Sequence, residues 1–364
     1  DQGGECELQD LALGYGSDVS RYNESKRVVK DLDLGPLVST DMTRCIHCTR
    51  CVRFGQEVAG IQELGTVGRG EDTLIGTYIE QSVDHELSGN IIDLCPVGAL
   101  NSKPFRYRAR SWEMSQIPTI APHDCIGSHL NAHVRRGRLM RVVPRDCEEI
   151  NETWISDRDR FSYEGVYAED RLQSPMIKID DEWREADWPE ALQLVAERMA
   201  GIPGNEVGLL ASPSSTLEEL YLLNRIARGI GSNNIDHRLR RSDFADQAND
   251  PIVPGIGLGL SEVDDLDVVL LVGSDIRHEA PMLAHRIRKA ALNGARVGFV
   301  NPGDFEVLFE VASNEVVKPS EMVSAMERLV AATAEEDPAV ASDSGIAGAL
   351  AQAKRPLILL GHLA

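Results

Sequence analysis

The sequence has no hydrophobic run long enough to cross a membrane. A membrane helix needs about eighteen or more apolar residues, whereas the longest candidates here are VVLLVG at 268–273 and LILLG at 357–361. Both have the length of buried strands. We therefore expect no direct membrane insertion, so that any membrane connection runs through another subunit.

Basic residues are scarce as well. The chain of 364 residues holds 37 Lys and Arg against 58 Asp and Glu, which gives a formal net charge of −21. A surface of that sign repels phosphate backbones, which argues against nucleic acid as a partner. It still allows a basic protein surface to dock.

The two ends lack the features of natural termini. The start, DQGGECELQD, has neither a Met nor a basic and apolar signal region, and the end, LILLGHLA, follows directly on an apparent strand. We expect this sequence to be a piece of a longer protein. Its composition, 42% hydrophobic and 26% charged, is that of soluble protein with room for two or three domains.

Cysteines are few, and their placement argues against disulfides. There are seven, an odd count, and three of them lie in one tight motif. The chain is also far longer than the small domains that disulfides stabilise. We expect a reducing compartment in which the thiols act as metal ligands.

The motif RCIHCTRCVRF at 44–54 is the strongest signal in the sequence. Its spacing puts Cys45, Cys48 and Cys51 within two helical turns or one wrapped loop. They are then close enough to occupy three corners of a cube of iron and sulfide. The fourth corner needs a residue from elsewhere in the chain.

The stretch DLCPVGALNSKP at 93–104 offers that residue, Cys95. Pro96 fixes the backbone and ends any helix, and Gly98 allows the chain to pass close to a cluster. Together the four cysteines predict one site with four thiolate ligands.

Zinc is the main alternative metal for this motif. Structural zinc sites usually draw their ligands as two separated CxxC-type pairs rather than as three plus one. We expect His47 to lie on the solvent side of the site or behind its ligands. The nearby Arg44, Arg50 and Arg53 either raise the reduction potential of a cluster or pair with the acidic excess of the surface.

The second half of the chain alternates between strand-like and helix-like stretches. Such alternation predicts parallel strands with helices on the sheet faces. The stretches are VGLLAS, LEELYLLNRIARGIG, DVVLLVGSD, APMLAHRIRKAALNG, RVGFVNP, EMVSAMERLVAATA and PLILLG. Before them, SHLNAHVRRGRLMRVV at 128–143 predicts a hairpin turning at Arg136-Gly137, and DWPEALQLVAERMAG at 187–201 a capped helix.

Several of these stretches together closely resemble the large iron-sulfur subunit of respiratory complex I, of the 75-kDa type and its bacterial counterpart. The resemblance runs through nearly the whole chain and is densest in the first 165 residues. It is carried by GGECELQDLALGYG, DMTRCIHCTRCVRFGQEVAG, ELSGNIIDLCPVGALNSKPFRYRARSWE and WISDRDRFSYEG.

The resemblance implies clusters beyond the four-cysteine site. In the family, an HxxxCxxCxxxxxC pattern binds a second 4Fe-4S cluster, and Cys6 matches its last ligand, so the other ligands lie upstream of Asp1. The family also begins with a 2Fe-2S domain that this piece lacks. The expected cofactors are therefore one complete and one partial 4Fe-4S site.

Some bacterial members carry one more 4Fe-4S cluster on a CxxCxxxC-like pattern. Here that region reads HDCIGSHLNAHV, with Ser128 and Ala132 at the spaced positions. We expect this cluster to be absent and Cys125 and Cys147 to be unligated. The nearby His123, His129 and His133 are expected to be ordinary surface or hairpin histidines.

The resemblance also implies the fold: an α+β iron-sulfur module followed by a molybdopterin-oxidoreductase-like α/β domain with a parallel sheet. We expect an iron-sulfur module at 1–115, a small β-rich unit at 116–185 that resembles a 4Fe-4S Mo/W bis-MGD-type domain without its cluster, and a truncated α/β domain at 186–364. The turn GSDIRHEAP at 273–281 would face a dinucleotide-like cofactor. No molybdenum cofactor is expected, and GIGLGL at 255–260 is a weak phosphate-binding signal.

The function implied is that of an electron-transfer subunit without catalytic side chains of its own. Electrons from NADH and flavin would pass through the clusters towards quinone, and the whole complex would couple this transfer to proton pumping. The implied partners are the NADH/FMN-binding subunit and downstream iron-sulfur subunits. The implied location is the cytoplasmic face of the bacterial inner membrane, or the matrix side in mitochondria.

Two alternative functions remain open. The chain could serve a molybdopterin formate dehydrogenase or an NAD-reducing hydrogenase, although the degraded HDCIGSHLNAH stretch disfavours the former. It could also be an assembly scaffold without redox activity, stabilised by zinc. Metal identity and reducibility distinguish the scaffold from an electron carrier.

Overall fold

The computed structural model describes the chain except for residues 1, 18, 79–81, 238–246, 250–254 and 334–344. Contacts within the chain group it into two units. The first consists of Asp1–Tyr163 together with Gly255–Ala364, and the second of Glu164–Pro254. None of the helices among the described residues is long and apolar enough to cross a membrane.

The cysteine-rich part of the first unit is built from short elements joined by turns. Strands β1 and β4 pair antiparallel, with Ser39 opposite Asn101, and so join the two segments that carry the cysteines. The elements are α1 (Glu7–Tyr15), β1 (Val38–Thr40), η1 (Met42–Arg44), α2 (Arg50–Arg53), the π-helix η2 (Phe54–Ala59), β2 (Leu64–Val67), η3 (Gly70–Asp72), β3 (Leu74–Thr77), α3 (Asn90–Leu94) and β4 (Leu100–Ser102).

A three-stranded antiparallel sheet follows, after η4 (Ser111–Glu113), in the order β5 (Ser115–Ile120), β6 (His129–Arg135) and β7 (Arg138–Pro144). The hairpin between β6 and β7 turns at Arg136 and Gly137, whose φ values are 51° and 77°. Two successive positive φ values are those of a two-residue turn that matches the strand twist. The predicted hairpin is confirmed, and the short helix α4 (Asp157–Phe161) comes after it.

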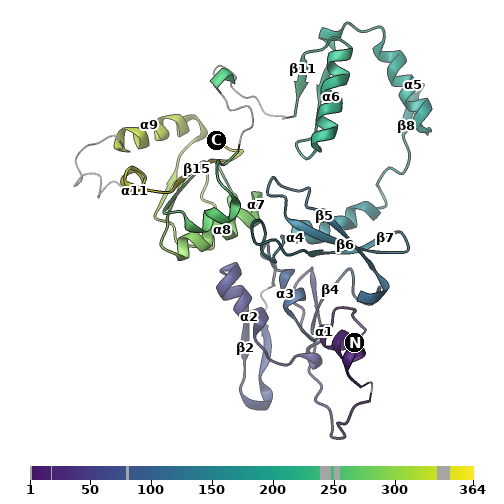
Figure 1. Cartoon of the computed structure of the whole chain (residues 1–364), viewed down its shortest axis with the longest axis vertical. Helices are drawn as coiled ribbons and strands as arrows, with labels where there is room; N and C mark the ends of the chain where they lie inside the picture. Colours follow the sequence, from purple (N-terminus) through teal and green to yellow (C-terminus); the bar gives the residue numbers. More distant parts are fainter. Residues whose placement is uncertain (1, 18, 79–81, 238–246, 250–254, 334–344) are drawn as a thin grey trace. The chain divides into compact units, whose positions relative to one another are not determined.

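The α/β part of the first unit is a four-stranded parallel sheet in the order β14-β13-β12-β15. Its strands are β12 (Val268–Val272), β13 (Arg296–Asn301), β14 (Ser313–Val316) and β15 (Pro356–Leu360). The helix α8 (Pro281–Leu292) covers one face, while α9 (Met322–Thr333) and α11 (Ile346–Gln352) cover the other (Figure 1). The predicted alternation of parallel strands and helices is therefore confirmed in this part.

Alternate side chains of β12 explain why both faces are covered. Val269 and Leu271 point into the core that contains α8, whereas Val268 and Leu270 join the smaller core under α9 and α11. All five residues of β12 are buried. A strand buried on both faces reads as a continuous apolar run, as VVLLV does.

One apolar core joins the cysteine-rich part to the α/β sheet. It contains Phe54 and Ile91 from the former and Ile287 and Phe299 from the latter. At its edge Arg288 of α8 reaches the π-helix η2 and donates to the carbonyls of Gln56 (3.2 Å) and Glu57 (3.0 Å). The two parts therefore pack as neighbours through both apolar and polar contacts.

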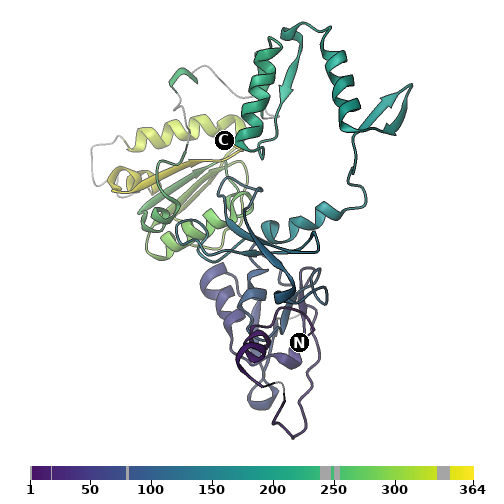
Figure 2. The same cartoon turned by 45° about the vertical axis from the view of Figure 1, so that its right-hand side comes forward.

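Among its described residues, the second unit holds short paired strands, the α-helices α5 and α6, and short 3-10 helices, one of them η7 (Gln247–Asn249) (Figure 2). Its elements are the hairpin of β8 (Met176–Ile179) and β9 (Glu182–Glu185), α5 (Trp188–Met199), η6 (Gly204–Glu206), the parallel pair of β10 (Gly208–Leu210) and β11 (Asn234–Asp236), and α6 (Leu217–Gly229). The side chain of Asp187 caps α5, as the sequence predicts, by accepting a hydrogen bond of 2.8 Å from the Glu190 amide.

Candidate metal centre

The three cysteines of the CxxCxxC motif lie on a wrapped loop, not on one helix. Cys45 ends the short helix η1, and α2 begins only at Arg50, after which Cys51 follows. Between them His47 and Thr49 have positive φ values of 51° and 60°. The left-handed conformation at these two positions prevents one regular helix from running from Cys45 to Cys51. Of the two arrangements that the spacing allows, the structure shows the loop.

The fourth cysteine ends the helix α3. The Cys95 amide donates a hydrogen bond of 3.3 Å to the carbonyl of Ile92, and Pro96 prevents the helix from continuing. Gly98 then takes a positive φ of 63° and turns the chain into β4. Because β4 pairs with β1, the turn returns Cys95 to the neighbourhood of η1 and the cysteine loop.

All four cysteines line one cavity in the first unit. They are half-buried and form no disulfide. Apolar side chains, among them Met42, Ile75 and Leu100, make up much of the remaining wall. The predicted ligands Cys45, Cys48, Cys51 and Cys95 are thus brought together, although the sequence separates the last from the others.

The surroundings of Cys45 and Cys51 disfavour a charged thiolate unless a cation is present. Burial raises the pKa of Cys51 to about 12, and the neighbouring cysteines Cys95, Cys45 and Cys48 add to this effect. Burial likewise raises the pKa of Cys45, while the His47 amide, which donates to Cys45 Sγ over 3.4 Å, lowers it. Thiolates gathered in such a place need positive metal to balance them.

The donor set fits an iron-sulfur cluster. Four thiols line one cavity whose remaining wall is largely apolar. The backbone amide of His47 also donates a hydrogen bond to Cys45 Sγ, and hydrogen bonds of this kind to the cysteine sulfurs are typical of iron-sulfur sites. Among the described residues no group of three or more His, Cys, Asp or Glu side chains is arranged to hold a single metal ion. A single tetrahedral ion would need its thiolate sulfurs about 4 Å from one another. The four cysteine sulfurs around a 4Fe-4S cluster lie farther apart, because the cluster stands between them. The absence of a single-ion arrangement from the described part of the chain therefore does not test the cluster assignment, which stays a prediction.

Two of the arginines beside the cysteines have identifiable contacts. Arg44 forms an ion pair with Asp41 at 2.5 Å, which matches the surface-pairing alternative. Arg50 lines the same cavity as the four cysteines. The role of His47 as a residue outside the ligand set stays a prediction.

Cys6 lies close to the four-cysteine site. It is 8% exposed and caps α1, where its Sγ accepts a hydrogen bond of 3.3 Å from the Gln9 amide. The next turn is tied to the segment after Cys95, because the Leu8 amide donates to the Pro96 carbonyl over 3.0 Å. Cys6 and Cys95 both line a second cavity of about 140 Å³.

Charged side chains surround this second cavity. Glu5 accepts from Arg141 over 3.0 Å and from the Ser102 amide over 2.7 Å. Burial raises the pKa of Glu5, and the positive charge of Arg141 opposes that rise. Asp93 lines the same cavity. The space between Cys6 and Cys95 is therefore bordered by carboxylates and by one guanidinium that forms an ion pair with Glu5.

The cysteines and histidines of residues 123–147, which we call the histidine region, are arranged differently. His123 contacts Asp159 at 2.9 Å, His129 contacts Arg145 at 3.0 Å, and His133 accepts from Arg141 over 3.1 Å. The last two histidines lie on strand β6, as their strand-like surroundings indicate. Cys125 is exposed and Cys147 half-buried. That both are unligated stays a prediction.

The turn after β12, which we expected to face a dinucleotide-like cofactor, is filled by backbone. Gly273 has a φ of 60°, and a Cβ built on it would overlap the Ala364 nitrogen. The Leu363 amide donates to the Gly273 carbonyl over 2.8 Å. Residues 361–364 thus occupy the space at this turn.

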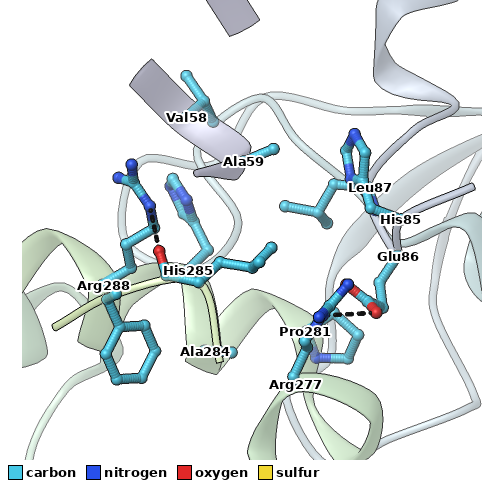
Figure 3. Close-up of a pocket in the computed structure, with 12 residues that line it drawn as sticks. Val58, Ala59, His85, Glu86, Leu87, Arg277, Pro281, Ala284, His285 and Arg288 are labelled. Atoms are coloured by element: carbon cyan, nitrogen blue, oxygen red, sulfur yellow. Dashed lines mark hydrogen bonds and ion pairs between the residues drawn. The ribbon is translucent and has the colours of Figure 1, made fainter. Parts of the chain in front are cut away.

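A third cavity, of about 30 Å³, lies where the cysteine-rich part meets α8. Figure 3 shows His85 and Leu87 on one side and His285 and Arg288 on the other. Arg288 is held by carbonyls, including that of Leu308 at 3.1 Å. The volume of this cavity exceeds the roughly 10–15 Å³ that a cavity needs to hold one water molecule.

Sequence reasoning missed a buried polar network behind Cys95. It consists of Ser88, Asn90, Asp157 and Arg160, each less than a tenth exposed. The only local signal is the presence of polar residues inside the otherwise apolar stretch ELSGNIIDLCP. A buried polar group needs a partner, but the sequence does not show which one.

Three family models match the chain. That of "NADH-quinone oxidoreductase subunit 3, ferredoxin-like domain" matches residues 35–101. That of "NADH-ubiquinone oxidoreductase NDSU1/NuoG-like, 4Fe-4S domain" matches residues 114–164. That of "Molybdopterin oxidoreductase" matches residues 171–363, which is more than half of the chain.

Curated relatives are similar over most of this chain. The NADH-ubiquinone oxidoreductase 75 kDa subunit of Reclinomonas americana is 44% identical over 81% of the chain and 44% of its own length. The mitochondrial NADH dehydrogenase [ubiquinone] iron-sulfur protein 1 of Solanum tuberosum is 45% identical over 83% and 41%. The mitochondrial NADH-ubiquinone oxidoreductase 78 kDa subunit of Candida albicans is 40% identical over 99% and 48%. The chain spans less than half the length of these relatives.

Proposed function

The chain belongs to the molybdopterin oxidoreductase family and is a homologue of the 75 kDa subunit of NADH-ubiquinone oxidoreductase, and on that basis we propose that it relays electrons through iron-sulfur clusters. The observation that carries the proposal is the shared cavity of Cys45, Cys48, Cys51 and Cys95. Four thiols that meet without forming a disulfide match the ligand set that a 4Fe-4S cluster takes, which supports the proposal.

Each part of the site has a task in this relay. A bound cluster would supply reversible one-electron chemistry. The four cysteine sulfurs would hold it, and the apolar wall around Met42, Ile75 and Leu100 would keep water from it. The His47 amide would stabilise negative charge on the sulfur of Cys45. We propose no catalytic or hydride-binding role for the side chains of this chain.

We further propose that Cys6 is one ligand of a second 4Fe-4S cluster, with the remaining ligands upstream of Asp1. The cavity that Cys6 shares with Cys95 supports this arrangement, because it makes the two sites neighbours. The hydrogen bond from the Leu8 amide to the Pro96 carbonyl holds the segment of Cys6 next to the segment of Cys95. Electrons could then pass between the sites without leaving the first unit.

The partners and location of the chain are proposed from its relatives. The names of these relatives identify them as components of NADH-ubiquinone oxidoreductase and of NADH dehydrogenase. We propose that this chain likewise works within complex I, between an NADH/FMN-binding subunit and downstream iron-sulfur subunits, with quinone as the final acceptor and proton translocation at the level of the complex. We place it in the peripheral arm, on the cytoplasmic or matrix side.

We also propose a division of labour along the chain. Residues 1–115 would form the iron-sulfur module, 116–185 a β-rich unit without a cluster, and 186–364 an α/β domain without molybdenum. The filled turn at Gly273 supports the last assignment, because a cofactor there would have to displace the backbone of residues 361–364.

The test is the metal content of the chain after anaerobic reconstitution, together with EPR of the dithionite-reduced sample. We expect about four irons with matching sulfide and a fast-relaxing S = 1/2 signal. Stoichiometric zinc without a signal would overturn the proposal and support the scaffold without redox activity.

A further inference from the structure

The helix that presents Cys95 is held by a segment far along the chain. Asn90, in the first turn of α3, donates to the carbonyl of Ile155 over 2.8 Å and accepts from the Ile155 amide over 3.1 Å. Just before the helix, Ser88 Oγ and the Gly89 amide donate to the two oxygens of Asp157 over 2.5 and 2.6 Å. The start of α3 is therefore fixed on residues 155–157.

The end of the same helix is held by an ion pair. The guanidinium of Arg160 contacts both carboxylate oxygens of Asp93, one through Nη1 at 3.3 Å and the other through Nη2. Arg160 is 4% exposed, and its Nη2 also donates to Asn90 Oδ1 over 3.4 Å. Two-point contact fixes both the direction and the distance of the pair.

Gly89 shows that the chain makes room for this contact. A Cβ at position 89 would lie 2.6 Å from Cδ and 2.8 Å from Nε of Arg160. A side chain there would push the guanidinium away from α3. The approach of Arg160 to Asp93 thus depends on the glycine in SGNII.

Asp93 is placed where its charge can act on the metal site. It comes two positions before Cys95, and both line the cavity that also contains Cys6. Among the other charged side chains on this cavity, Glu5 and Arg141 are paired with each other. Glu7 and Asp10 are exposed on α1, and the Asp93 side chain is itself 33% exposed, so solvent screens all three charges in part. Asp93 differs from the other two in its contact with the buried guanidinium of Arg160. With Arg160 in place, the charge of Asp93 is balanced as well.

We propose that Arg160 is a positioning residue for Cys95 and that the Asp93–Arg160 pair sets the reduction potential of the cluster bound there. Reduction adds negative charge to the cluster, so an unbalanced carboxylate nearby opposes it and an unbalanced guanidinium favours it. In the Asp93–Arg160 pair the negative and positive charges offset each other, and the same contact holds the end of α3 in place. This inference rests on the proposed function, because it needs a cluster at the four-cysteine site.

The experiment is an EPR-monitored redox titration of the reconstituted chain and four variants at one pH. Arg160→Met removes the positive charge but keeps most of the side-chain length, Asp93→Asn removes the negative charge, and a third variant combines both. The matched control is Arg158→Met. Arg158 lies on the same helix α4 but contacts Asp124 and the carbonyls of His278 and Glu279.

We expect the midpoint potential to fall in Arg160→Met, to rise in Asp93→Asn, and to return towards the wild-type value in the double variant. Arg158→Met should leave it unchanged. Shifts of opposite sign are the mark of a charge effect, because a loss of packing alone would move both single variants in the same direction. Equal shifts in the same direction, or none, would overturn the proposal.

Two further measurements separate a failure to bind iron from a failure of the charge effect. If Arg160→Met takes up no iron, Arg160→Lys, which keeps the charge, should restore the cluster, and the rise in Asp93→Asn still tests the charge effect by itself. If the wild-type chain shows no cluster signal, the proposed function fails. If the wild type shows one and the variants do not shift, only the inference about the Asp93–Arg160 pair fails.

Discussion

The four-cysteine site and the histidine region hold similar residues and arrange them in opposite ways. In the four-cysteine site, thiols from two distant segments face one apolar cavity. In the histidine region, His123, His129 and His133 each contact an Asp or Arg side chain. Side chains that already have strong partners within the protein do not offer those atoms to a metal. The partners that the side chains already have within the protein, more than their residue types, therefore distinguish the candidate metal site from the histidine region, in which His133 is buried.

The largest effect should follow from a change in the four-cysteine site. Cys48→Ser removes one corner ligand, and a serine hydroxyl is a poor substitute for thiolate, so the chain should lose its cluster. Iron, sulfide and EPR assays after reconstitution would record that loss. If the iron content of Cys48→Ser equalled that of the wild type, Cys48 would not be a ligand, and the four-cysteine site would no longer differ from the histidine region as a metal site.

A second change should destabilise the neighbourhood of the histidine region and spare the cysteines. Asn151 is fully buried and bonds the His129 amide (2.9 Å) and the carbonyls of Arg145 (3.3 Å) and Trp154 (3.0 Å). Asn151→Ala leaves these groups without their partner and should lower the free energy of unfolding by about 3 kcal/mol. Urea denaturation would measure the loss.

The same variant should keep its iron content, since none of these contacts involves a predicted ligand. Asn314→Ala is a suitable control, because Asn314 bonds Asp304 at the exposed surface and its loss should cost little. An Asn151→Ala chain that binds no iron would show that the two regions are one cooperative site.

A third prediction concerns pH. Burial, with the charge of Arg141 beside it, lowers the pKa of His133 from 6.5 to about 4. Between these values the unfolded chain binds a proton that the folded chain does not, so the free energy of unfolding falls as the pH falls through this window. At pH 5 the His133 contribution is a loss of about 2 kcal/mol relative to pH 7.5.

His133→Gln should remove that contribution, because glutamine does not titrate. The difference between wild type and variant, measured by urea denaturation at pH 5 and at pH 7.5, isolates His133 from the other titrating groups. A difference that does not change with pH would contradict the prediction.

The smallest effect should come from the cysteines outside the site. Cys125→Ser and Cys147→Ser should each leave the iron content of the reconstituted chain unchanged. Loss of iron in either would overturn the ligand assignment and make the histidine region a second metal site.

Local patterns in the sequence predict local features of this fold. Gly137 marks the hairpin, Asp187 marks the start of α5, and the VVLLV run marks a strand buried on both faces. Each signal lies within a few residues of the feature that it predicts. The spacing of the cysteines belongs to the same class, because the loop that carries three of them is short.

Contacts between distant segments could not be predicted in this way. Asn90 bonds Ile155 and Arg288 bonds Gln56, and no periodicity or spacing links the members of either pair. Nor does any local pattern predict the π-helix after Cys51, whose carbonyls are bound by the distant Arg288. Such features are decided by which partner is near in space.

The insertion of Glu164–Pro254 between the two stretches of the first unit has a consequence for synthesis. All four cysteines of the site are made well before Arg288 and the rest of α8, which pack against η2. At about 5–20 residues per second, roughly 10–40 seconds separate the synthesis of Cys95 from that of Arg288. During that interval the carbonyls of Gln56 and Glu57 in η2 lack the guanidinium of Arg288, from which they accept hydrogen bonds in the folded chain.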